Sequence, residues 1–145
     1  MTYEEKQLLL RDLSARLSYG VMFQYQTGSY SSTGTSGYFP MVGIVQNAVV
    51  LDIKNRGLFN LSLEDSQCKP YLRPMSSMTD YEKEAYRSLQ NKIVVQCDNF
   101  GKPIDYVYVQ NVTSIDWLLS HHFDFRELIE KGLALEALEE MYNIK

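Results

Sequence analysis

The chain has 145 residues, of which 45% are apolar and 22% charged, and its formal net charge is −4. A chain of this length can bury enough surface in one core to fold without disulfides or metal. The composition excludes disordered, collagen-like and coiled-coil proteins, and no apolar run is long enough to span a membrane. We expect one domain, residues 1–145, with a lobe boundary near residues 69–78.

Charged residues are spread unevenly. Residues 1–110 carry 11 basic and 11 acidic side chains, whereas residues 111–145 carry 3 basic and 7 acidic ones. Lys and Arg form no cluster of the kind that binds nucleic acid, so duplex DNA is not an expected ligand. No charged residue lies between Arg16 and Asp52, which sets this segment apart from the rest of the chain.

The cellular setting follows from the N-terminus and the cysteines. Acidic residues stand where a secretory signal needs a basic region and an apolar stretch. Cys68 and Cys97 show no CxxC spacing, which favours free, buried thiols over a disulfide framework. We therefore expect a cytoplasmic protein.

The first half of the chain predicts a helix followed by a sheet. Thr2 and Glu5 form the pattern of a capping box before a helix with a leucine stripe, which Gly20 ends. Residues 21–26 then predict a strand, as do residues 58–63. Residues 42–45 and 48–53 form two strands around a tight turn at 46–47, or one bent strand.

The second half predicts helices around one hairpin. Prolines in residues 69–74 indicate a linker that joins no central strand. Thr79 and Glu82 predict a second capping box, before a helix with Met78, Tyr81, Ala85 and Leu89 on one face. Residues 93–97 and 104–109 predict a β-hairpin, with Tyr106 and Tyr108 on one face.

Two short helices are expected after the hairpin. Thr113 or Ser114 caps the first, and Asp124 caps the second, which ends before Gly132. The tail from residue 133 onward is at best weakly helical. The fold class is therefore α+β: an N-terminal helix, an antiparallel sheet of about five or six strands that can curl toward a barrel, and helices in the C-terminal half.

The leading functional hypothesis rests on the uncharged segment. Residues 27–37 consist of glycine, serine, threonine and one tyrosine, a composition that provides adaptable hydrogen bonds and rigid contact area, as antibody paratopes do. A solvated, flexible loop is the alternative. The segment lacks the lysine of a phosphate-binding loop, and no cofactor is expected. The candidate binding residues are Tyr25, Tyr30, Ser31, Ser32, Thr33 and Tyr38, and the expected ligand is a protein or a nucleotide-like molecule.

The alternative hypothesis is a small metal-assisted or acid-base hydrolase. His121 and His122 are the only histidines, and Asp116 and Asp124 lie near them in sequence. Adjacent helical side chains point about 100° apart, which is unsuited to binding one ion. The plainer interpretation places both histidines at the C-terminus of a helix, where they interact with its negative pole. No metal site is assigned.

A third hypothesis concerns the tyrosines. The chain contains 11 of them, and tyrosines can stack on the bases of single-stranded nucleic acid. Such platforms need a positive groove beside the rings, and Lys102 is the only cation close in sequence to Tyr106 and Tyr108. Tyrosines that pack a thin sheet are the alternative.

Three segments resemble a known family. They comprise residues 1–10 with 19–21, residues 68–79, and residues 115–118 with 121–124 and 128–134. Together they resemble small uncharacterised proteins that recur in gut Bacteroidales genomes, their prophages and other mobile elements. The resemblance implies a prokaryotic cytoplasm and an accessory role, such as the inhibition of a host factor. It implies no activity, cofactor or catalytic residue.

Overall fold

The N-terminal helix forms where its capping box predicts it. In the computed structural model, which describes residues 1–26, 36–53, 56–64 and 69–142, helix α1 covers Tyr3–Arg16. The Thr2 hydroxyl accepts the Glu5 N–H at 3.1 Å, and the Glu5 carboxylate accepts the Thr2 N–H at 2.8 Å, which satisfies two of the free donors at the helix start. A short 3-10 helix, η1 (Leu17–Tyr19), then ends at Gly20 with φ 70°, a conformation that glycine adopts without strain.

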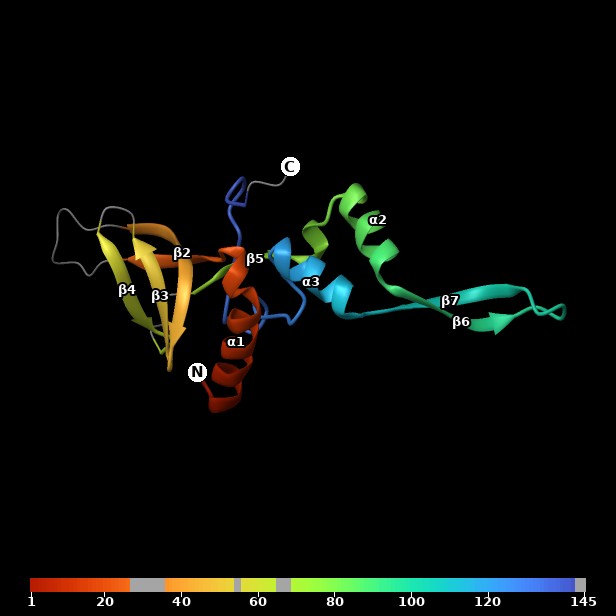
Figure 1. The fold of residues 1–145 in the computed structure, drawn as a ribbon, viewed down its shortest axis with the longest axis horizontal. Coiled ribbons are helices and arrows are strands. Elements are labelled where there is room, and N and C mark those ends of the chain that lie inside the picture. The colour runs from red at the N-terminus through yellow and green to blue at the C-terminus, as the bar shows by residue number, and fades with distance from the viewer. Residues whose placement is uncertain (27–35, 54–55, 65–68, 143–145) are drawn as a thin grey trace.

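Four antiparallel strands form the largest sheet. They are β1 (Met22–Gln26), β2 (Ser36–Val45), β3 (Ala48–Ile53) and β4 (Gly57–Ser62), paired in chain order. A tight turn with Gln46 at φ 54° separates β2 from β3, so the two-strand alternative is correct. The sheet is open (Figure 1) and does not curl into a barrel.

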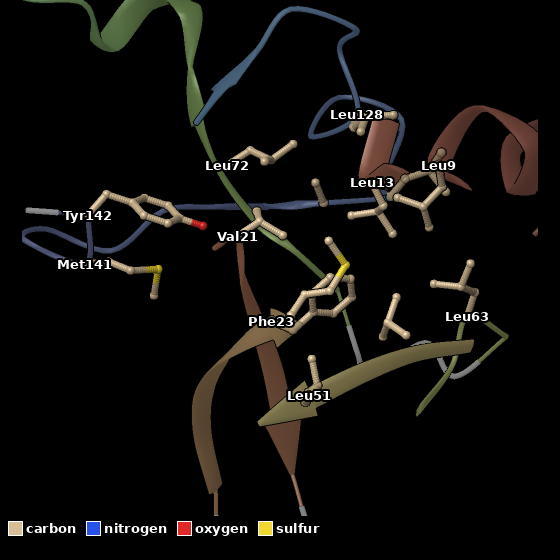
Figure 2. Packing of buried hydrophobic residues seen from close by; sticks show 14 of the residues in the cluster. Leu9, Leu13, Val21, Phe23, Leu51, Leu63, Leu72, Leu128, Met141 and Tyr142 are labelled. Atoms are coloured by element: carbon tan, nitrogen blue, oxygen red, sulfur yellow. The ribbon is translucent and has the colours of Figure 1, made fainter. Parts of the chain in front are cut away.

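The main core lies between α1, this sheet and the C-terminal segment. Leu13, Phe23 and Leu72 are fully buried there, and Figure 2 shows them in one cluster that also includes Leu128 and Tyr142. The Tyr142 hydroxyl donates to the Tyr71 carbonyl at 2.6 Å and accepts the Met22 N–H at 2.9 Å. The tail from residue 133 onward, expected to be weakly helical, therefore completes the core through Met141 and Tyr142.

A second, parallel sheet crosses the centre of the molecule. Strand β5 (Tyr71–Pro74) lies between β8 (Phe123–Asp124) and β9 (Leu135–Glu136). The prediction that residues 69–74 join no central strand is wrong. Pro70 and Pro74 stand at the two ends of β5, where a missing N–H does least harm, and the Arg73 N–H between them donates to the His122 carbonyl at 2.7 Å.

Helices α2 and α3 lie beyond this sheet. After the short η2 (Met75–Ser77), the capping box of Thr79 and Glu82 begins α2 (Asp80–Leu89), as predicted. The predicted apolar face is confirmed in part, because Met78 is buried and Ala85 and Leu89 are half-buried. Tyr81 is the exception at 84% exposed, and Glu82 is buried instead, in an ion pair with Arg73 at 2.8 Å. Helix α3 (Val112–Ser120) is capped by Asn111 and not by Thr113 or Ser114.

The predicted second C-terminal helix does not form. Residues 125–134 make turns instead. Both carboxylate oxygens of Asp124 accept backbone N–H groups, from Leu128 and Ile129, at 2.9 Å each. Glu127 adopts φ 60°, which a right-handed helix cannot contain. Asp124 therefore organises a turn and does not cap a helix. None of the described helices is both long and apolar enough to cross a membrane.

Candidate functional site

A β-hairpin projects from the body of the molecule. It consists of β6 (Asn91–Cys97), β7 (Pro103–Val109) and the turn between them, and we call it the arm. The arm extends away from α2 and α3 at one end of the molecule (Figure 1). Every residue of both strands is exposed, and β6 and β7 pair only with each other among the described strands. Both faces and both edges of the arm are therefore open to solvent.

The turn at the tip of the arm is ordered by Asp98. Its carboxylate accepts the N–H groups of Phe100 and Lys102 at 2.8 and 2.9 Å, and its own N–H donates to the Lys102 carbonyl at 2.8 Å. Gly101 adopts φ 79°, which glycine provides at no steric cost. These bonds hold Phe100 at the tip with 95% of its surface exposed.

The two faces of the arm differ in chemistry. Strand pairing places Val94 opposite Tyr106 and Lys92 opposite Tyr108, and the alternation of side chains brings Tyr106 and Tyr108 onto one face, as predicted. Lys92 Nζ lies 3.7 Å from the centre of the Tyr106 ring. We call the face with Lys92, Tyr106 and Tyr108 the tyrosine face. The opposite, aliphatic face carries Ile93, Val107 and Val109.

Polar contacts fix the base of the arm to the helices. The Asn111 amide donates to the Leu89 carbonyl at 2.8 Å and to the Asn91 side chain at 2.9 Å. Gln110 donates to the Tyr86 hydroxyl, and partial burial raises the pKa of Tyr86. The Tyr86 ring stacks on Trp117 at 5.7 Å between ring centres. The base of the arm is therefore fixed to the helices, whereas the rest of the hairpin is exposed.

His121 and His122 lie at the C-terminal end of α3. His121 ends α3, as the plainer interpretation expects; its Nδ1 contacts the Trp117 carbonyl at 2.9 Å, and its ring stacks on the Trp117 ring at 4.2 Å. His122 stacks on Tyr142 at 3.7 Å. Burial, aided by the charges of Arg16 and Arg73, lowers the pKa of His122 to about 4.

The predicted acid partners do not face these rings. Asp116 is exposed on α3, and both oxygens of Asp124 are occupied by backbone N–H groups. Within the part of the chain that the structure describes, no group of three or more His, Cys, Asp or Glu side chains is placed to hold a metal ion. The geometry gives the hydrolase hypothesis no support.

The candidate residues of the uncharged segment lie partly outside the described residues, because Tyr30, Ser31, Ser32 and Thr33 belong to residues 27–35. Tyr25 is half-buried and contacts Phe39 edge-on at 6.0 Å. Tyr38 is 45% exposed and contacts Tyr71 at 6.2 Å. Tyr25 and Tyr38 occupy successive cross-strand pairs of β1 and β2, so they point to opposite faces of the sheet.

The sequence predicts the hairpin correctly but does not predict that its strands are exposed. Residues 92–97 and 104–109 are apolar on both faces, a pattern that usually indicates a strand covered on both sides. Cys97, expected to be buried, is an exposed free thiol on β6, while Cys68 lies outside the described residues. The arm is nonetheless the most prominent uncovered feature of the molecule.

Comparison with known proteins found no relative: no protein-family model, curated protein or solved structure matches the chain.

Proposed function

We propose that this chain is a non-enzymatic interaction protein whose arm binds another protein. The observation that carries the proposal is that every residue of two strands built from core-type residues is exposed. A large exposed apolar surface marks an interaction site in a soluble protein. A lone two-stranded hairpin is marginally stable in water, so contact with a partner would stabilise the arm. Its exposed large apolar residues are Ile93, Val94, Val95, Phe100, Ile104, Tyr106, Val107, Tyr108 and Val109.

The composition of the arm fits a protein partner. Tyrosine and arginine are enriched in protein interfaces, and the tyrosine face carries both, because Arg87 of α2 lies 5.8 Å from the Tyr108 ring centre. The open edges of β6 and β7 can accept a further strand through backbone hydrogen bonds. The resemblance to mobile-element proteins supports an accessory role, of which inhibition of a host factor is one form.

Single-stranded nucleic acid is the second candidate ligand. One observation favours it: Arg87 and Lys92 lie over the rings of Tyr108 and Tyr106. The tyrosines of the arm therefore have two cations beside them, although only Lys102 is close to them in sequence. Base stacking on a tyrosine contributes roughly 1–3 kcal/mol. Binding of a labelled oligonucleotide that falls steeply with salt and is lost in Tyr106→Ala/Tyr108→Ala would establish this candidate.

Photo-cross-linking tests the protein-binding proposal. A photoreactive amino acid at position 107, on the aliphatic face of the arm, is compared with the same amino acid at position 81, on the exposed side of α2. We expect position 107 to cross-link to one protein in nuclease-treated host lysate, which mass spectrometry identifies. The purified partner should then bind the wild-type chain and lose at least tenfold in affinity on Val107→Asp, because the substitution buries an unpaired charge in an apolar contact.

The control separates the arm from the uncharged segment. A variant with residues 28–36 shortened keeps the arm intact and should bind the purified partner with unchanged affinity. If the shortened variant loses the partner while Val107→Asp retains it, the binding surface lies in the segment 27–37 and the arm proposal is wrong.

A further inference from the structure

A hollow beside the base of the arm combines apolar walls with a carboxylate rim. Its volume is about 590 Å³, and its walls include Met75, Phe125 and Ile129. Gln110, the residue that follows β7, also lines it, so the hollow lies where the arm leaves the body. Cavities of roughly 300–1,000 Å³ accept small ligands or large side chains. We call this hollow the base socket.

The rim of the base socket carries uncompensated negative charge. Two of its four carboxylates have partners in the body: Asp124 accepts backbone N–H groups, and Glu127 lies 3.7 Å from Lys131 Nζ. The other two, Glu130 and Glu136, are exposed and form no ion pair among the described residues. The lining contains no basic side chain in the described part of the chain. The socket therefore suits an apolar group that arrives with a cation.

The tip of the arm presents that combination. Phe100 is an apolar ring with 95% of its surface exposed, and Lys102 stands two residues away in the same ordered turn. The hydrogen bonds to Asp98 fix this turn, so little freedom remains to be lost when the ring is buried. Tip and socket match in polarity and in charge.

The tip cannot reach the base socket of its own chain. Each arm strand has seven residues, and at roughly 3.3 Å per residue the tip stands about 20 Å or more from the base. The arm is extended and directed away from the body (Figure 1). Only the socket of another molecule is accessible to Phe100.

We infer that two copies of this chain pair through their arms, which lie antiparallel so that Phe100 and Lys102 of each copy occupy the base socket of the other. This inference rests on the proposed function, because it names a second copy as the protein that the arm binds. Both contacts form together under one twofold axis, so the assembly closes as a dimer and does not extend into a filament. The apolar residues along the two arms then cover one another.

The arm and the base socket both contribute apolar surface to such an interface. Stable protein interfaces cover about 800 Å² on each partner, somewhat less than a tenth of the 9283 Å² surface of this chain. The arm contributes nine exposed large apolar side chains, and the socket adds its apolar walls.

Sedimentation equilibrium of the purified full chain tests the inference. The wild-type chain should show a reversible monomer–dimer equilibrium across micromolar concentrations. Phe100→Asp should raise the dissociation constant tenfold or more, since it removes the apolar anchor of both sockets and puts a charge in each. Tyr81→Asp is the matched control, because Tyr81 is 84% exposed on α2 and touches neither arm nor socket, and it should leave the equilibrium unchanged.

A charge exchange tests the pairing of tip and socket directly. Lys102→Glu and the double variant Glu130→Lys/Glu136→Lys should each weaken the dimer severalfold, and combining all three changes should restore part of the lost affinity. A mixture of the Phe100→Asp and Glu130→Lys/Glu136→Lys chains should associate more tightly than either chain alone, because one intact tip meets one intact socket. A failure of both rescues would overturn the inference.

Two results separate this inference from the proposed function. If the wild-type chain is monomeric, or if Phe100→Asp and Tyr81→Asp dimerise like the wild type, the arms do not pair through the sockets. Where Val107→Asp nevertheless abolishes binding of a partner cross-linked at position 107, the arm still binds a protein and only the choice of a second copy is wrong. If changes in the arm alter neither the dissociation constant of the dimer nor the binding of a cross-linked partner, both proposals fail.

Discussion

The body and the arm contain similar residues in opposite environments. Leu13, Phe23 and Leu118 of the body are fully buried, whereas no residue of the two arm strands is buried. Apolar character alone therefore does not define the core of this protein. The body uses its apolar area to offset the entropy of folding. The arm leaves its apolar residues exposed, and under our proposal they contribute to binding.

The sharpest contrast should come from truncating one apolar side chain in each region. Phe23→Ala should lower the free energy of unfolding by about 3–5 kcal/mol, because a fully buried ring leaves a cavity. Val107→Ala, at a site 45% exposed on the arm, should change it by less than about 0.5 kcal/mol. Urea unfolding of both variants measures this difference. Equal losses would show that the arm packs against the body.

Buried ion pairs should give the next largest effect. Arg16 and Asp12 are completely buried, with Nε and Oδ2 2.6 Å apart, and Arg16 also donates to the Phe123 carbonyl. Asp12→Ala should cost about 3 kcal/mol or more, because it leaves a buried guanidinium without a counter-charge. The control Glu84→Ala, which breaks a surface pair with Arg87, should cost less than about 1 kcal/mol. A small loss for Asp12→Ala would mean that water reaches Arg16.

Sequence patterns located most elements of the body because their signals are local. The capping boxes at Thr2 and Thr79 use residues three apart, and each begins a helix where predicted. The helix expected after Asp124 failed because Glu127 adopts a positive φ, in a turn where the Asp124 carboxylate accepts the N–H groups of Leu128 and Ile129. On α2, the burial of Glu82 was missed because it depends on an ion pair with Arg73 of β5, which no pattern within the helix encodes.

The candidate site was harder to predict for the same reason. Tyr106 and Tyr108 were correctly placed on one face, since alternation is a property of any strand. Their exposure depends on the absence of a third described strand beside them, which no local pattern encodes. The base socket brings together Met75, Gln110 and Ile129, which are far apart in sequence and carry no shared motif.

Acidic solution should affect the body through His122. Its pKa falls from 6.5 to about 4 on folding, so below pH 6.5 the unfolded chain binds a proton that the folded chain does not. Stability should therefore decrease as the pH falls from 6.5 to 4, by at most about 3 kcal/mol and by less where water screens the ring. Urea titrations across this range measure the decrease.

A matched variant assigns the pH effect to this ring. His122→Asn tolerates the observed φ of 65° and should remove most of the dependence between pH 6.5 and 4. Below that range stability should still fall, because the ion pair with Arg73 lowers the pKa of Glu82 and protonation of Glu82 breaks that pair. An unchanged slope in His122→Asn would locate the titrating group elsewhere.

Removal of the arm should have the smallest effect on the body. Replacing residues 93–107 with a two-residue Asn-Gly turn keeps the contacts of Asn91 and Asn111 at the base and removes no buried residue. At concentrations where the wild type is monomeric, the free energy of unfolding should change by less than about 1 kcal/mol. At higher concentrations the wild type should gain thermal stability by mass action, because dimerisation favours the folded state, and the shortened chain should not. A concentration-dependent melting temperature in the shortened chain would place the contact between copies on the body, and a large loss at low concentration would make the arm part of the folding unit.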